Sequence, residues 1–145
     1  MVLATYYELL KEYVSFKTVH DTTTFSFEAE KTIKWLSDLF MKHQFEVKEY
    51  STYDIPLLLA THIQNKNLPT ALIYTYYDLP LIDISPNWKN NPYNLYLGKE
   101  EIIGRGVAEN KGQFMLYLTT MFHLLQHNQL GYNVIFLIDG TQHKV

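Results

Sequence analysis

Three apolar segments of the chain end in polar residues and glycines that could carry chemistry. These ends are residues 76–78, 104–112 and 139–143, and they include carboxylates, an amide and a histidine. In open α/β sheets, ligands bind where strands run into loops, so we expect the three ends to converge. Carboxylates and imidazoles brought together from separate strands are typical of a metal site.

The motifs in these segments resemble those of a known family. They read LIYTYYDLP (72–80), GRGVAENKG (104–112) and DGTQH (139–143). In sequence and order they are similar to LIYGHYDVVP, GRGxxDxKG and EGxEE of the dinuclear zinc exopeptidases and amidohydrolases. That family includes aminoacylase, acetylornithine deacetylase, succinyl-diaminopimelate desuccinylase and carnosinase. The chain resembles the N-terminal half of their catalytic domain.

The resemblance implies a fold and a set of site residues. It implies an α/β class with three αβα layers and a mixed, mostly parallel sheet, and a two-zinc centre that hydrolyses peptide or amide bonds. Asp78 matches the family's orienting Asp. Tyr76 stands at a zinc-binding His, Glu109 at the Asp that bridges the metals, Gln142 at the general base and His143 at a ligand Glu.

The substitutions weaken both metal binding and catalysis. A neutral phenol with a pKa near ~10, such as Tyr76, is a poor zinc donor beside imidazole. Glu109 keeps a carboxylate on a longer side chain, and His143 keeps a nitrogen donor. Gln142 is the gravest change, because an amide cannot take a proton from a metal-bound water. We therefore expect zinc to be absent or weakly bound and hydrolysis to be slow.

The same residues also have plain structural interpretations. Tyr76 and Asp78 can form a buried tyrosine whose hydroxyl bonds to a neighbouring carboxylate at the end of a strand. Residues 104–112 can form a glycine turn and a helix start that need backbone freedom but no ligand. We favour these interpretations because Glu109 replaces the bridging Asp.

Other histidines and one tryptophan have weaker claims to a role. His123 and His127 have the i, i+4 spacing of a helical zinc pair, but a leucine stands where the general base of that motif belongs, which favours a surface position. His20 and His62 have no partners in sequence, so we assign them no chemistry. Trp88 is expected to pack a long loop onto the sheet or to wall a pocket.

The composition indicates one globular domain, residues 1–145. The chain is 47% hydrophobic and 19% charged, which suits a single core. A net charge of −3 with scattered basic residues gives no surface for nucleic acid or an anionic membrane. The absence of cysteine excludes disulfides, thiol nucleophiles and thiolate metal sites, and favours a cytoplasmic location. No apolar run approaches the roughly 20 residues that span a bilayer.

Periodicity predicts helices alternating with strands. We expect helices at 3–15, from the cap Ser26 through Phe40, and at 110–127, strands at 45–51, 56–63, 70–77 and 133–139, a short strand near 102, and a long loop at 79–98. Strand 133–139 is apolar and could lie deep in a sheet. So near the last residue it would otherwise be a poor, open sheet edge, whose unpaired backbone invites pairing.

Three functional hypotheses remain open. The first is a degenerate or truncated enzyme, a pseudoenzyme, since the family's remaining ligands and lid domain lie beyond the motifs present. The second is an active hydrolase in which Glu109, His143 and Asp78 hold one ion and another chain supplies the missing ligands. The third is a binding or assembly module that self-associates or docks a partner through the open sheet edge or the Trp88 loop.

Overall fold

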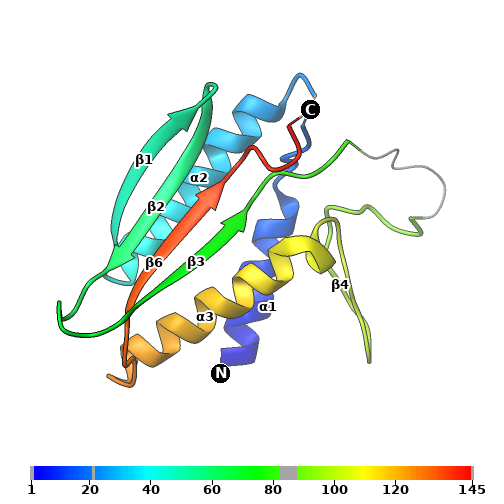
Figure 1. Cartoon of the computed structure of the whole chain (residues 1–145). Coiled ribbons are helices and arrows are strands. Elements are labelled where there is room, and N and C mark those ends of the chain that lie inside the picture. The colour runs from blue at the N-terminus through cyan, green and yellow to red at the C-terminus, as the bar shows by residue number, and fades with distance from the viewer. Residues whose placement is uncertain (1, 21, 82–87, 145) are drawn as a thin grey trace.

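The computed structural model describes residues 2–20, 22–81 and 88–144. Its helices are α1 (Val2–Ser15), α2 (Phe25–Lys42) and α3 (Gly112–Gln126), with a helical turn η1 (Val107–Lys111) before α3. Its strands are β1 (Glu46–Thr52), β2 (Ile55–His62), β3 (Thr70–Tyr76), β4 (Tyr96–Leu97), β5 (Ile102–Ile103) and β6 (Asn133–Asp139). All the helices and strands predicted from periodicity are present (Figure 1).

The main sheet has the strand order β1-β2-β6-β3. It is mixed, as expected, but only β3 and β6 pair in parallel; β1 with β2 and β2 with β6 are antiparallel. The expectation of a mostly parallel sheet is therefore wrong. One cause is the connection between β1 and β2, where Tyr53 and Asp54 both have positive φ, the backbone of a two-residue hairpin turn.

Strand β6 lies inside the sheet, between β2 and β3. The prediction that residues 133–139 could lie deep in a sheet is therefore confirmed, because both sides of this strand carry ladder hydrogen bonds. The alternative of an open edge at this strand is wrong. Its apolar sequence fits this central position. Among the described strands, β1 and β3 form the edges of this sheet.

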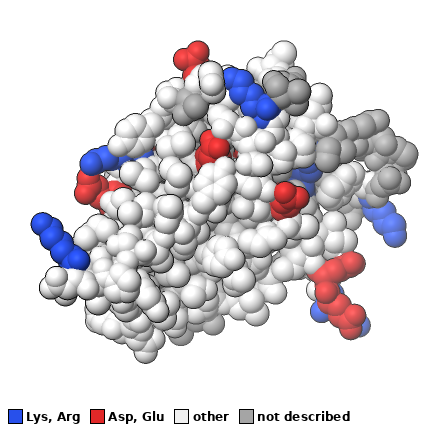
Figure 2. Space-filling view, in the orientation of Figure 1, with Lys and Arg blue, Asp and Glu red and all other residues white. Residues whose placement is uncertain are grey.

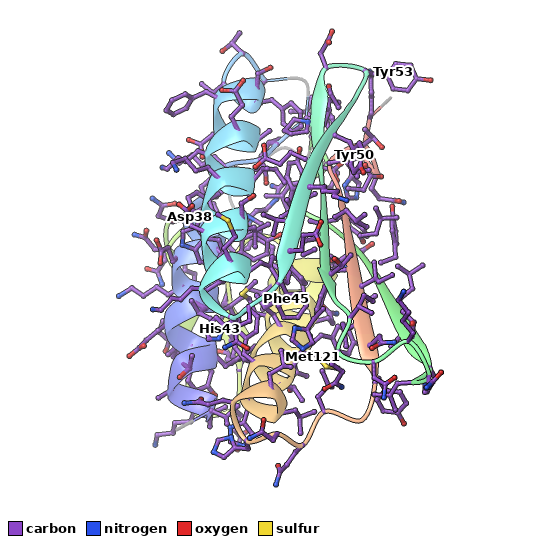
Figure 3. The ribbon with its side chains drawn as sticks, turned by 90° about the vertical axis from the view of Figure 1, so that its left-hand side faces the viewer. Asp38, His43, Phe45, Tyr50, Tyr53 and Met121 are labelled. Atoms are coloured by element: carbon purple, nitrogen blue, oxygen red, sulfur yellow. The ribbon has the colours of Figure 1, made fainter. Side chains whose placement is uncertain are left out.

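The helices cover one face of the sheet (Figures 1 and 3). Phe136 of β6 packs against Phe40 of α2 and Phe114 of α3, with ring centroids 5.2 and 5.9 Å apart. Tyr13 of α1 stacks on Trp35 of α2 and meets the edge of Phe114, so α1 packs on the other helices. The α/β class is confirmed, but the described residues form two layers instead of the expected three.

Smaller expectations also have outcomes. Helix α2 begins at Phe25, with Thr24 at its N-cap, so the prediction that Ser26 caps it is wrong. Residues 82–87 of the predicted long loop lie outside the described residues. No helix in the described part of the chain is both long and apolar enough to cross a lipid bilayer.

The buried aromatic contacts predict how the fold responds to truncation of Phe136. Phe136 is fully buried, so Phe136→Ala should lower the free energy of unfolding by about 3–5 kcal/mol. Leu116, on α3, is 53% exposed, and Leu116→Ala should change it by less than about 0.5 kcal/mol. Urea unfolding followed by circular dichroism measures both, and equal losses would contradict the described core.

Candidate active site

The carboxylate of Asp78 connects three segments that are distant in sequence. Asp78 lies two residues beyond the end of β3 and is 1% exposed. Its Oδ2 accepts hydrogen bonds from the backbone N–H of His143 at 2.6 Å and from His143 Nδ1 at 3.2 Å. His20 Nε2, from the segment after α1, lies 3.2 Å from the same oxygen. Asp78 Oδ1 is buried without a hydrogen-bond partner among the described residues.

His20 belongs to the site, although no role was predicted for it. Its Nε2 lies 2.7 Å from the carbonyl oxygen of Gly140. Because a carbonyl only accepts, Nε2 carries the proton, which is shared between Gly140 and Asp78. The ring stacks on Phe25 at 4.1 Å. No sequence motif marks His20, because its partners are supplied by the ends of β3 and β6.

Tyr76 and Glu109 bond to one another. The Tyr76 hydroxyl donates to Glu109 Oε1 at 2.7 Å, and the Tyr76 ring meets the His143 ring edge-on at 5.3 Å. Burial, followed by the hydrogen bond and negative charge of Glu109, raises the pKa of Tyr76 to about 12. The phenol therefore stays protonated at neutral pH. Its partner is Glu109, and not the Asp78 that is its neighbour in sequence.

Gln142 is hydrogen-bonded to a different tyrosine, Tyr74. Its Oε1 accepts a hydrogen bond from the Tyr74 hydroxyl at 3.2 Å, and the same hydroxyl lies 3.2 Å from Asp139 Oδ2. Burial and the charge of Asp139 raise the pKa of Tyr74. Sequence reasoning missed Tyr74, because its role depends on the parallel pairing of β3 with β6. The side chain at the general-base position is thus an amide held by a neutral phenol.

Segment 104–112 makes anchoring contacts on both sides of Glu109. Gly106 has φ of 77° and lies against Leu79, where a Cβ would approach within 2.6 Å, so only glycine fits without strain. The Arg105 guanidinium donates to the Pro80 carbonyl. Lys111 donates from Nζ to the carbonyl oxygens of Tyr13 and Phe16, at 3.0 and 2.8 Å. These contacts join the segment to the β3 loop and to α1.

A cleft of about 270 Å³ opens beside these residues and is lined by Glu109, His143, Trp88 and Arg105, among others. A larger cavity of about 410 Å³ lies between the Trp88 loop and the β4–β5 hairpin, and it contains none of the five predicted site residues. Trp88 lines both spaces, which agrees with the expectation that it walls a pocket. The smaller cleft is the one lined by predicted site residues, Glu109 and His143.

The donor set does not fit a two-zinc centre. Tyr76 is a neutral phenol, which is a poor metal ligand, and its hydroxyl donates a hydrogen bond to one oxygen of Glu109. His143 uses Nδ1 toward Asp78, which leaves Nε2 as its free nitrogen. Within the described residues, no group of three or more His, Cys, Asp or Glu side chains is arranged to hold a metal ion. His123 and His127 lie together on α3 and its end, away from the site, with ring centroids 4.2 Å apart.

Comparisons with known proteins identify relatives of this chain. No family model matches the chain. It is 25% identical to the probable di- and tripeptidase DUG2 of Saccharomyces cerevisiae, in an alignment that covers 92% of this chain and 17% of that protein. The structure of human carnosine dipeptidase 1 matches with a TM-score of 0.86 and 21% identity, over 95% of this chain and 32% of the other.

A third match names the family. The M20 family metallo-carboxypeptidase Sso-CP2 of Sulfolobus solfataricus has a TM-score of 0.83 and 26% identity, over 94% of this chain and 30% of the other. These findings confirm the resemblance derived from the motifs. The chain spans between 17% and 30% of the lengths of the curated relatives that it matches.

The contacts of His20 predict a large effect of removing its imidazole. His20→Ala removes the imidazole donor to the buried Gly140 carbonyl and one of the donors around the Asp78 carboxylate, which keeps those of His143, so the free energy of unfolding should fall by about 2–4 kcal/mol. His62 makes one exposed hydrogen bond, to the Gln44 carbonyl, and His62→Ala should cost less than about 1 kcal/mol. Urea unfolding compares the two variants, and equal costs would show that His20 is not a structural link.

The burial of Lys111 predicts a pH dependence of stability. Burial lowers the pKa of Lys111 from 10.5 to about 7. Between these values the unfolded chain binds a proton that the folded chain does not, so the free energy of unfolding rises with pH, by up to about 1.4 kcal/mol per unit.

Other groups also titrate, so the measured quantity is the stability of the unaltered chain minus that of Lys111→Met. Denaturant unfolding at several pH values should show this difference increasing from pH 7 toward pH 10. Parallel curves for the two proteins would contradict the lowered pKa.

Proposed function

We propose that this chain, a relative of the M20 dipeptidases, keeps their scaffold but does not hydrolyse peptides by their metal-dependent reaction. The observation that carries the proposal is the 2.7 Å hydrogen bond from Tyr76 to Glu109. It joins two side chains at positions where the resembled family binds its metals. The hydrogen bond gives the Tyr76 hydroxyl and one Glu109 oxygen a partner within the protein, so neither atom needs a metal ion as a partner.

The chemistry of the neighbouring side chains supports the same conclusion. A tyrosine binds a metal well only as phenolate, and the pKa of Tyr76, raised to about 12, makes loss of its proton costly at neutral pH. His143 Nε2 and the second oxygen of Glu109 are the donors left beside the cleft. A structural zinc needs four ligands and a catalytic zinc three with an open position. Weak zinc binding, or none, therefore belongs to the proposal.

The general-base position supports it independently of the metal. Gln142 cannot accept a proton from water, and removing a general base typically costs about 10²–10⁴ in rate. Its amide oxygen already accepts from Tyr74. Even a bound ion would thus lack the proton acceptor of the resembled mechanism. The cytoplasmic location expected from the cysteine-free composition is part of this proposal.

Metal analysis combined with an activity assay tests the proposal. We expect the purified chain, dialysed against zinc and then buffer, to keep substoichiometric zinc and to show no chelator-sensitive hydrolysis of dipeptides, tripeptides or carnosine. The combined variant Tyr76→His, Glu109→Asp, Gln142→Glu and His143→Glu restores family ligand types and should keep more zinc.

A matched control adds a carboxylate elsewhere. Gln129→Glu changes an exposed residue after α3 and should leave zinc retention unchanged. Stoichiometric zinc in the unaltered chain, with turnover that a chelator abolishes, would overturn the proposal in favour of an active enzyme with an altered metal set.

A further inference from the structure

Two histidines at the end of α3 form a pair that the candidate active site does not use. His123 lies in the last turn of this helix, and His127 is its C-cap. The i, i+4 spacing places the two side chains next to one another on the helix surface. Their ring centroids lie 4.2 Å apart, with 45° between the ring planes. His123 is half-buried and His127 is exposed, so an ion in solution has access to the pair.

The hydrogen bond of His127 prepares its ring as a metal ligand. Its Nδ1 lies 2.8 Å from the carbonyl oxygen of His123. Because a carbonyl only accepts, Nδ1 carries the proton and Nε2 has the lone pair. A histidine that binds a metal almost always donates its other N–H to a carbonyl or carboxylate in this way. A neutral His123 ring also has one nitrogen with a lone pair, so the pair offers two donor atoms.

The place of the pair in the fold favours a positive ion. Helix α2 has His43 as its C-cap, as α3 has His127. The His43 ring lies at the end of α2, beside α3 (Figure 3), and stacks on Phe122 with centroids 3.7 Å apart. Two helix C-termini therefore meet here. Each carries a partial negative charge that stabilises a cation within its last turn.

A cavity of about 280 Å³ gives the ion room. Its lining includes both histidines of the pair together with His43, Thr119 and Gln126, and no lysine or arginine among the described residues. The lower left of the molecule, where α3 ends in Figure 1, is made of uncharged side chains in the view of Figure 2. A water molecule occupies ~30 Å³, so an ion can keep several water ligands in this space.

We propose that His123 and His127 chelate one copper(II) ion, whose other ligands are water. Two imidazole nitrogens ~2.0 Å from a metal place their ring centroids ~4.5 Å apart for a right angle at the metal, and ~5 Å apart for a tetrahedral angle. The observed 4.2 Å is nearer to the right angle. That angle belongs to the tetragonal geometry of copper(II), which is also the divalent ion of highest affinity for nitrogen donors.

This pair is distinct from the zinc centre considered for the candidate active site. A structural zinc needs four ligands, and a catalytic zinc needs three with an open position. Within the described residues, no third His, Cys, Asp or Glu is arranged to join the pair. Helix α3 has 15 residues and rises ~1.5 Å per residue, so its end lies ~20 Å from its start beside Glu109. The copper site therefore does not depend on the function proposed above.

Equilibrium dialysis against Cu²⁺, in a buffer that does not bind metals, tests the proposal on chain purified without a polyhistidine tag. We expect one Cu²⁺ per chain, weaker binding of Zn²⁺, and an electron paramagnetic resonance spectrum of tetragonal copper with splitting from imidazole nitrogen. Loss of an outer partner of a ligand alone costs about 10–100-fold in affinity, so His123→Gln and His127→Gln should each weaken binding at least about 10-fold. Circular dichroism verifies that each variant is folded.

His62→Gln is the matched control, because it removes an imidazole on β2, outside the cavity, and should leave copper binding unchanged. His143→Gln separates the two sites. Copper that is lost with His143→Gln and kept with His123→Gln would overturn the proposal and assign the ion to the active-site cleft. Absence of binding, or an adventitious ion only, which none of these variants releases, would also overturn it. None of these outcomes depends on whether the chain hydrolyses peptides.

Discussion

The buried carboxylate of Asp78 is the contact on which the arrangement of the site depends. Its Oδ2 contacts His20 Nε2, from the segment after α1. It also accepts hydrogen bonds from the backbone N–H and the ring Nδ1 of His143, in the turn after β6. Leaving a buried carboxylate without such donors is costly. The position that orients a metal ligand in the resembled family therefore holds three chain segments together here.

The substitutions around Asp78 form a consistent set. The Tyr76 hydroxyl donates a hydrogen bond to Glu109, Gln142 accepts one from Tyr74, and His143 Nδ1 donates one to Asp78. Each replaced side chain finds a partner within the protein. A metal centre instead needs its ligands to be held apart with free lone pairs. The hydrogen bonds among these groups support the proposal that the site holds no zinc centre of the family type.

The sequence was sufficient for the elements and for the convergence of the motifs, because periodicity and strand-end chemistry are local signals. It was not sufficient for the order of strands. The apolar run 133–139 looks the same at an edge or in the centre, and only the pairings with β2 and β3 distinguish the two. His20 was missed for a related reason, since Gly140 is 120 residues away. The third layer was expected from the family resemblance, and the face of the sheet opposite α1, α2 and α3 carries no helix among the described residues.

The most direct test of the account is an NMR titration of the Tyr76 ring, with ¹³Cζ-labelled tyrosine assigned through Tyr76→Phe, with and without Zn²⁺. We predict that the Tyr76 phenol stays protonated from neutral pH to pH 10, and that zinc does not change its Cζ shift, because its proton is held by Glu109. Deprotonation of Tyr76 near neutral pH on addition of zinc would show that it binds the metal and would contradict the account.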